Sequence, residues 1–140
     1  MIRSEVIHGS AVALNGRGLL ILGPSGSGKS ALALALMGMG AALVSDDRTV
    51  LHRAGDTVVA DAPDTIRGLI EARGVGILRA DPAGPVRLAL VADLGRVEDA
   101  RLPPRRGHDL LGVMLPLVLG PYGPHLSCAL RQYLLAGRGD

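Results

Sequence analysis

The residues best suited to chemistry lie in one short glycine-rich segment. It fits the pattern G-x-x-x-x-G-K-[ST] in full, as Gly23, Pro24, Ser25, Gly26, Ser27, Gly28, Lys29 and Ser30. In that pattern backbone N–H groups turn toward phosphate oxygens, the lysine reaches the β- and γ-phosphates, and the serine hydroxyl binds Mg²⁺. Lys29 is the only lysine among the 15 Lys and Arg residues. The segment therefore indicates a phosphate-binding loop, with a Gly/Ser-rich surface turn as the alternative.

Two adjacent acidic residues are candidates for anchoring a metal. Asp46 and Asp47 follow the apolar run Ala41 to Ser45, which we expect to form a strand beside the strand that leads into the loop. At least one of these carboxylates would then point toward the γ-phosphate and its metal, the alternative being a polar strand exit. Glu71, taken alone, is more typical of a solvated surface residue.

The elements around the loop follow from local patterns. Asn15-Gly16 between the apolar runs Ala11 to Leu14 and Leu19 to Leu22 predicts an antiparallel hairpin. The Ala- and Leu-rich run Ala31 to Met37 predicts a helix directly after the loop. The order strand, loop, helix is the context that the loop motif requires.

The rest of the chain continues this alternation of strands and helices. Thr49 to His52 and Thr57 to Ala60 predict a second hairpin, and Asp64 is expected to cap a short helical segment from Thr65 to Ile70. We further expect strands at Val86 to Ala92 and Val113 to Leu119 and a helix from Pro124 to about Leu135. The sum is an α/β fold with a mixed sheet and antiparallel hairpins, in one domain spanning residues 1–140.

Composition excludes several other classes of protein. The chain has two Tyr and neither Phe nor Trp, so the aromatic platform usual in RNA-binding and single-strand-binding proteins is missing. Its single Cys128 excludes an internal disulfide and a four-thiolate zinc site. The longest uncharged stretches are shorter than a membrane span and no signal peptide is apparent. We therefore expect a cytoplasmic protein that binds neither nucleic acid nor membrane.

Four segments, in order and spacing, resemble the catalytic domain of HPr kinase/phosphorylase. They are His8-Gly9-Ser10, the loop Gly23 to Ser30, Leu43-Val44-Ser45-Asp46-Asp47, and Ile70-Glu71-Ala72-Arg73-Gly74-Val75-Gly76-Ile77. The resemblance covers Val6 to Leu78 well and the remainder weakly. It implies a P-loop domain of the phosphoenolpyruvate carboxykinase-like type. It also implies an ATP- and Mg²⁺-dependent kinase, a homohexamer, that phosphorylates a serine of HPr, the small carrier protein of the phosphotransferase system.

The resemblance also implies roles for single residues. Asp47 would accept the proton of the serine hydroxyl and return it when the phosphate is removed by phosphorolysis. Lys29 and His8 would lie at the transferring phosphate, and Arg73 belongs to the stretch associated with both reactions. Ser30 and Glu71 would hold Mg²⁺, to which Asp46 is added as the metal anchor of a simple NTPase. Without the resemblance, His8 is equally well a strand histidine bonded to backbone.

One segment departs from the family pattern. The loop that normally carries Gly-Arg-Asn after a Val-Pro-Val strand reads here Leu115-Pro116-Leu117-Val118-Leu119-Gly120-Pro121-Tyr122-Gly123, without arginine. Two alternatives to the HPr kinase therefore stay open. One is a small P-loop NTPase or small-molecule kinase, and the other is a nucleotide-sensing module that has lost catalysis.

Overall fold

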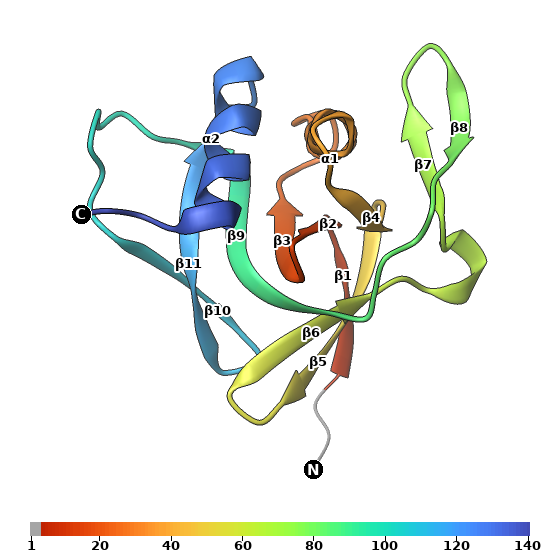
Figure 1. The fold of residues 1–140 in the computed structure, drawn as a ribbon, viewed down its shortest axis with the longest axis horizontal. Helices are drawn as coiled ribbons and strands as arrows, with labels where there is room; N and C mark the ends of the chain where they lie inside the picture. Colours follow the sequence, from red (N-terminus) through yellow and green to blue (C-terminus); the bar gives the residue numbers. More distant parts are fainter. Residues whose placement is uncertain (1–3) are drawn as a thin grey trace.

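The computed structural model describes residues 4–140, in which a mixed β-sheet is covered by two helices (Figure 1). The strands are β1 (Ser4–His8), β2 (Ser10–Leu14), β3 (Arg17–Leu22), β4 (Ala42–Ser45), β5 (Arg48–Ala54), β6 (Thr57–Asp61), β7 (Leu69–Ala72), β8 (Gly76–Arg79), β9 (Val86–Val97), β10 (Arg106–Leu110) and β11 (Val113–Gly120). The helices are α1 (Lys29–Gly38) and α2 (Pro124–Ala136), with a short 3₁₀ helix, η1 (Asp64–Ile66). This α/β architecture agrees with the fold class predicted from the sequence.

The main sheet has the strand order β1-β5-β6-β9-β3-β2-β4, and β11 also pairs with β9 and carries β10 on its other side. The pairs β3–β9 and β9–β11 are parallel, whereas the remaining strand pairs of this sheet are antiparallel. Strands β7 and β8 form a separate hairpin that projects from the body of the molecule (Figure 1). Both hairpins predicted from the sequence, β2–β3 and β5–β6, are confirmed.

The β2–β3 hairpin decides which segments meet next to the glycine-rich loop. Asn15 and Gly16 form its two-residue turn and both have positive φ, 52° and 74°, as the tight turns that match strand twist require. The resulting register pairs Ser10 with Ile21. The residues just before β2 therefore lie beside the loop that follows β3.

Strand β3 is buried on both faces, which explains its unbroken apolar sequence. Leu19 and Ile21 belong to the hydrophobic core that includes Leu32 and Leu36 of α1, and Leu20 belongs to a second core between β-strands. All five side chains are at most 1% exposed. Because α1 is pressed onto β3 in this way, the loop between them has both of its ends fixed.

Two expectations about neighbouring elements are wrong. Strand β4 does not lie beside β3, because β2 is inserted between them and pairs with both. The helical segment expected from Thr65 to Ile70 is only the 3₁₀ helix Asp64–Ile66, without a side-chain cap from Asp64. Arg67 has ψ of 126°, outside the helical region, and Gly68 has φ of 75°, so the chain turns away from the helix at these two residues before β7 begins.

The connection from β6 to β7 is held by Arg67. Its guanidinium donates to both carboxylate oxygens of Asp61, at 2.6 and 3.3 Å, to Asp64 at 3.1 Å, and to the Ala62 carbonyl at 3.0 Å. The hydrogen bond from Arg67 lowers the pKa of Asp61 below its ordinary value of 3.8. This cluster fixes the path of the chain just before β7 delivers Glu71.

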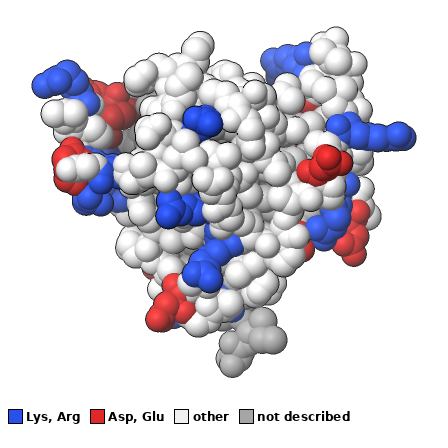
Figure 2. Space-filling view, in the orientation of Figure 1, with Lys and Arg blue, Asp and Glu red and all other residues white. Residues whose placement is uncertain are grey.

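Charged side chains do not gather into one patch on the face drawn in Figure 2, where basic and acidic residues lie scattered around a largely uncharged centre. Within residues 4–140, no helix is long and apolar enough to cross a bilayer.

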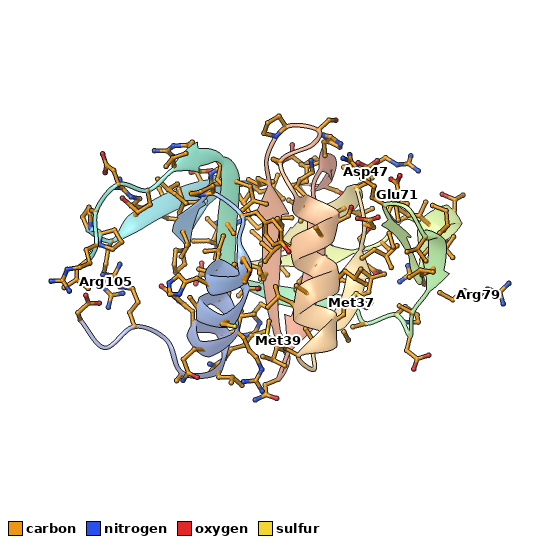
Figure 3. All side chains as sticks on the ribbon, turned by 90° about the horizontal axis from the view of Figure 1, so that it is seen from above. Met37, Met39, Asp47, Glu71, Arg79 and Arg105 are labelled. Atoms are coloured by element: carbon orange, nitrogen blue, oxygen red, sulfur yellow. The ribbon has the colours of Figure 1, made fainter. Side chains whose placement is uncertain are left out.

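We predict that Arg67→Gln lowers the free energy of unfolding at pH 7, because Asp61 loses its charged hydrogen-bond partner. A carboxylate with a lowered folded-state pKa stabilises the fold above its unfolded pKa, and this stabilisation is lost as the pH falls through the folded value. The difference between wild type and R67Q should therefore shrink below pH 3.8. Urea unfolding between pH 7 and pH 3 measures it, with the outward-pointing Arg79→Gln (Figure 3) as control. A pH-independent difference would contradict the assignment.

We also predict opposite effects for two Gly→Ala changes. A Cβ at Gly18 would lie 3.0 Å from the Arg87 carbonyl oxygen and equally close to side-chain atoms of Leu88 and Val86, whereas a Cβ at Gly38 meets nothing within 4 Å. G18A should therefore lower the free energy of unfolding by about 1–3 kcal/mol. G38A, at the end of α1, should raise it by up to about 1 kcal/mol. Denaturant titration of both variants tests this, and equal stabilities would refute it.

Candidate active site

The glycine-rich loop joins the end of β3 to the start of α1. Gly23, Gly26 and Gly28 have φ of 148°, 83° and 103°, a region that side-chain-bearing residues rarely occupy. The Lys29 ammonium group donates to the carbonyl oxygens of Gly23 at 2.8 Å and Pro24 at 3.2 Å. The only lysine of the chain is thus folded over the loop at the first residue of α1. The glycines, the helix N-terminus and the ammonium together make this loop suited to anions.

The Asp46 carboxylate is the point at which three elements meet. One oxygen, Oδ1, accepts hydrogen bonds from the Ser30 hydroxyl of α1 at 2.6 Å and from the Ser10 hydroxyl of β2 at 3.0 Å. The other oxygen, Oδ2, accepts one from the backbone N–H of Glu71 in β7 at 3.0 Å. Asp46 is 7% exposed, and a buried carboxylate is tolerated only when it is bonded in this way.

Asp47 lies on a strained turn between β4 and β5. Its φ is 67°, and the N–H of Arg48 donates to the Asp46 carbonyl at 2.7 Å. A hydrogen bond between the residues on either side of a central residue with positive φ defines the rare and strained form of the γ-turn. Such backbone strain costs of the order of 1–3 kcal/mol and persists only where neighbours enforce it. The turn lifts the Asp47 side chain, 64% exposed, away from the sheet.

The tripeptide His8-Gly9-Ser10, where β1 ends and β2 begins, enforces this turn. The ring Nε2 of His8 lies 2.7 Å from the Asp47 carboxylate oxygen Oδ1. The N–H of Gly9 donates to the Asp47 carbonyl at 2.8 Å, and the Asp47 N–H donates to the Ser10 hydroxyl oxygen at 3.1 Å. Three consecutive residues therefore hold the side chain, carbonyl and amide of the same aspartate.

A cavity of about 550 Å³ opens between the loop, the start of α1, Asp47 and the β7–β8 hairpin. It is lined by Ser25, Gly26, Gly28, Lys29, Ser30, Ala31, Leu34, Asp47, Glu71, Ala72, Arg73 and Val75. Figure 3 shows Asp47 and Glu71 close together near the end of α1 at which the helix begins, while Met37 and Met39 lie at its other end. The cavity thus brings basic, acidic and hydroxyl groups from separate segments into one space.

Most residues singled out from the sequence lie at this cavity or one hydrogen bond behind it. Asp46 and His8 do not line it but bond to Ser30 and Asp47, which do. Gly23, Pro24 and Ser27 belong to the loop without lining the cavity. Sequence reasoning missed Ser10, although the tripeptide containing it had been noted. Its role becomes visible only when the hydrogen bonds to both aspartates are known.

The oxygen atoms at and around Asp46 are of the kind that bind a small hard cation. No group of three His, Cys, Asp or Glu side chains in residues 4–140 is placed to hold a metal by itself. Mg²⁺, however, is normally held by one or two carboxylates together with water and phosphate oxygens. The Ser30 hydroxyl, the Asp46 carboxylate bonded to it, and Glu71 at the cavity wall make up such a partial set.

The segment without the expected arginine places Tyr122 against the loop. An added Cβ on Gly28 would lie 3.0 Å from the Tyr122 ring, so this ring packs on the loop just before α1. Arg105 and Arg106, which precede this segment in the sequence, do not line the cavity. Arg106 pairs with Glu98 through bonds of 2.8 and 2.9 Å, which lower the pKa of Glu98. Arg105 lies far from Asp47 (Figure 3) and bonds to the Asp140 carbonyl.

Comparison with known proteins matches both the sequence and the shape. The family model of the HPr Serine kinase C-terminal domain matches residues 1–82. The HPr kinase/phosphorylase of Caldicellulosiruptor bescii is 37% identical over 136 residues, which make up 88% of this chain and 44% of that protein. The one from Peptoclostridium acidaminophilum is 36% identical over 140 residues, 91% of this chain and 46% of that protein. The chain therefore spans less than half the length of these two curated relatives.

A solved structure extends the likeness to nearly the whole chain. The Hpr(Ser) kinase/phosphatase from Coxiella burnetii superposes with a TM-score of 0.79 at 26% identity, covering 94% of this chain and 93% of that one. The matched shape includes the region after residue 82, where the sequence likeness is weaker. The resemblance inferred from four short segments is confirmed: the chain belongs to the HPr Serine kinase C-terminal domain family.

Proposed function

We propose that the chain is the catalytic domain of an ATP- and Mg²⁺-dependent kinase that phosphorylates a serine of an HPr-type carrier protein. Family membership supports the reaction class. The observation that carries the proposal is Asp47, a carboxylate raised on a strained turn at the same cavity that Lys29 and Ser30 line. A phosphate-binding loop facing a positioned base is the arrangement that phosphoryl transfer to a hydroxyl needs.

Each part of the cavity takes one role in this reaction. The loop from Gly23 to Ser30 binds the phosphates through backbone N–H groups, and Lys29 leaves its carbonyl partners to neutralise phosphate charge. Ser30, Asp46 and Glu71 hold the Mg²⁺ ion, which neutralises charge on the phosphate oxygens when bound.

Asp47 then serves as the general base. Asp47 removes the proton from the hydroxyl of the acceptor serine while the serine oxygen attacks the γ-phosphorus. The bond between that phosphorus and the ADP oxygen breaks in the same step. His8, bonded to the same carboxylate, orients it and adds a polar group at the transferring phosphate. Arg73, from the turn of the β7–β8 hairpin, faces the same cavity and stabilises charge on the transferred group.

The reverse reaction, phosphorolysis of phosphoserine, would use Asp47 as the proton donor. The segment expected to carry an arginine presents Tyr122 to the loop instead, so we propose that the forward reaction is the principal one. By the same family reasoning we propose a phosphoenolpyruvate carboxykinase-like P-loop fold, a homohexamer, and a cytoplasmic location. The nucleotide-sensing module remains the second candidate, favoured by the missing arginine.

We predict that the protein transfers label from γ-labelled ATP to HPr in an acid-stable form, as phosphoserine is and phosphohistidine is not. Asp47→Asn should lower the rate by roughly 10²- to 10⁴-fold, while the fold is kept because Asn tolerates positive φ. Asp56→Asn, in the β5–β6 turn, is the matched control and should leave the rate unchanged.

The outcomes of this labelling experiment separate the candidate functions. ATP binding without turnover, unaffected by D47N, would establish the sensing module. Hydrolysis or transfer to a metabolite, with unlabelled HPr, would establish the NTPase or small-molecule kinase. Full activity in D47N would rule out Asp47 as the base.

We further predict that Ser30→Ala raises the Mg²⁺ concentration needed for half-maximal rate by about tenfold or more, since the loss of one ligand worth about 1.4 kcal/mol has that effect. Titrating MgCl₂ at fixed ATP measures it. Ser127→Ala, which removes a buried hydroxyl bonded to the Pro124 carbonyl in α2, is the control. An unchanged Mg²⁺ requirement in S30A would show that Ser30 is not a metal ligand.

A further inference from the structure

Among residues 4–140, Ser10 is the one side chain that is hydrogen-bonded to both aspartates. Its hydroxyl lies 3.0 Å from the Asp46 carboxylate oxygen Oδ1 and 3.1 Å from the backbone nitrogen of Asp47. Ser10 is 0% exposed, so its hydroxyl bonds to these two partners and not to bulk water.

The direction of the two hydrogen bonds is fixed by chemistry. An ionised carboxylate only accepts and a backbone N–H only donates, so the hydroxyl must give its proton to Asp46 and receive the Asp47 N–H on a lone pair. Alanine at this position supplies neither. A cysteine would fill the space but is a weak partner in both directions.

The two bonded groups have different tasks in the proposed reaction. Asp46 is bonded to Ser30 and to the Glu71 N–H, on the metal side of the cavity. Asp47 carries the base on a backbone turn whose φ of 67° is unfavourable by itself. A hydroxyl that ties the amide of this turn to the carboxylate on the metal side fixes the base relative to the metal site.

We propose that Ser10 is a positioning residue that holds Asp47 in its strained turn and aligns it with the metal side of the cavity. Ser10 does not touch the reacting atoms, so it acts through Asp47. The kinetic part of this inference rests on the proposed kinase function, whereas its structural part does not.

The structural part is tested by amide hydrogen exchange, followed by NMR. In Ser10→Ala the Asp47 amide loses its acceptor and should exchange about tenfold faster, as expected for the loss of one hydrogen bond. Ser127→Ala, an equally buried Ser→Ala change far along the chain, should leave the Asp47 amide unchanged. If S10A does not fold, S10C takes its place. Unchanged exchange at Asp47 would overturn the proposal.

The kinetic part is tested with a double-mutant cycle. S10A should lower kcat for HPr phosphorylation by about 10- to 100-fold, the usual effect of losing a partner of a functional group, with KM for ATP within about twofold of wild type. In the D47N background the same change should have no further effect, because its target is gone. Ser10→Thr, which keeps the hydroxyl, should recover activity if its thermal unfolding matches wild type.

The possible results separate the two proposals. An equal loss of rate from S10A in the wild-type and D47N backgrounds, or a loss that appears in KM alone, would show that Ser10 only supports the fold. If the wild type transfers no phosphate to HPr, the proposed function fails. In that case the exchange measurement alone decides whether Ser10 holds Asp47.

Discussion

The site depends on one buried carboxylate, that of Asp46. Its oxygens draw together the first turn of α1, the start of β2 and the backbone of β7. Each donor is a neutral group, and the three hydrogen bonds compensate the burial of the carboxylate. Removing the carboxylate would leave the Ser10 and Ser30 hydroxyls and the Glu71 N–H without a common acceptor. The three elements around the cavity would then no longer be tied to one another.

Asp46, whose hydrogen-bonding capacity is used, is followed in the sequence by Asp47, whose backbone is strained. Asp46 is nearly buried, whereas Asp47 is exposed on a turn with positive φ. The strain is offset by the bonds that His8, Gly9 and the following serine make to Asp47. Stability and reactivity are therefore divided between two adjacent aspartates, one that anchors the structure and one that is presented to the cavity.

Signals that are local in sequence predicted most of the fold. The Asn15-Gly16 turn, the glycine-rich loop and the helix after it follow from the φ preferences and helix propensities of single residues. Features that depend on contacts between residues distant in sequence could not be predicted. The insertion of β2 between β3 and β4 depends on strand pairing over long separations. The chain after the short 3₁₀ helix is held by a contact that is also distant in sequence, from the Ala80 N–H to the Gly68 carbonyl at 2.9 Å.

The residues of the site, too, were predictable where the signal is local in sequence and not where it depends on distant contacts. Local patterns identified the loop and the aspartate pair, and the family resemblance added Glu71 and Arg73. Asp47, Glu71 and Arg73 do line one cavity with the loop, whereas Asp46 lies behind it, bonded to Ser30. It assigned no task to Ser10, because a serine on an apolar strand has no signature of its own. Nor could it show that Tyr122 packs on the loop at Gly28, since this contact joins residues 94 positions apart.

The antiparallel course of β2 has a consequence for the minimal catalytic unit. Because β2 runs antiparallel to β3 and β4, the site is built from the carboxyl ends of β3 and β4 and the amino end of β2. A fragment cut to the strand, loop and helix would retain the whole nucleotide motif and still lack the tripeptide that shapes Asp47. In the proposed reaction, phosphate binding rests on the loop and proton transfer on Asp47 with its tripeptide, so the two tasks come from separate segments of this architecture.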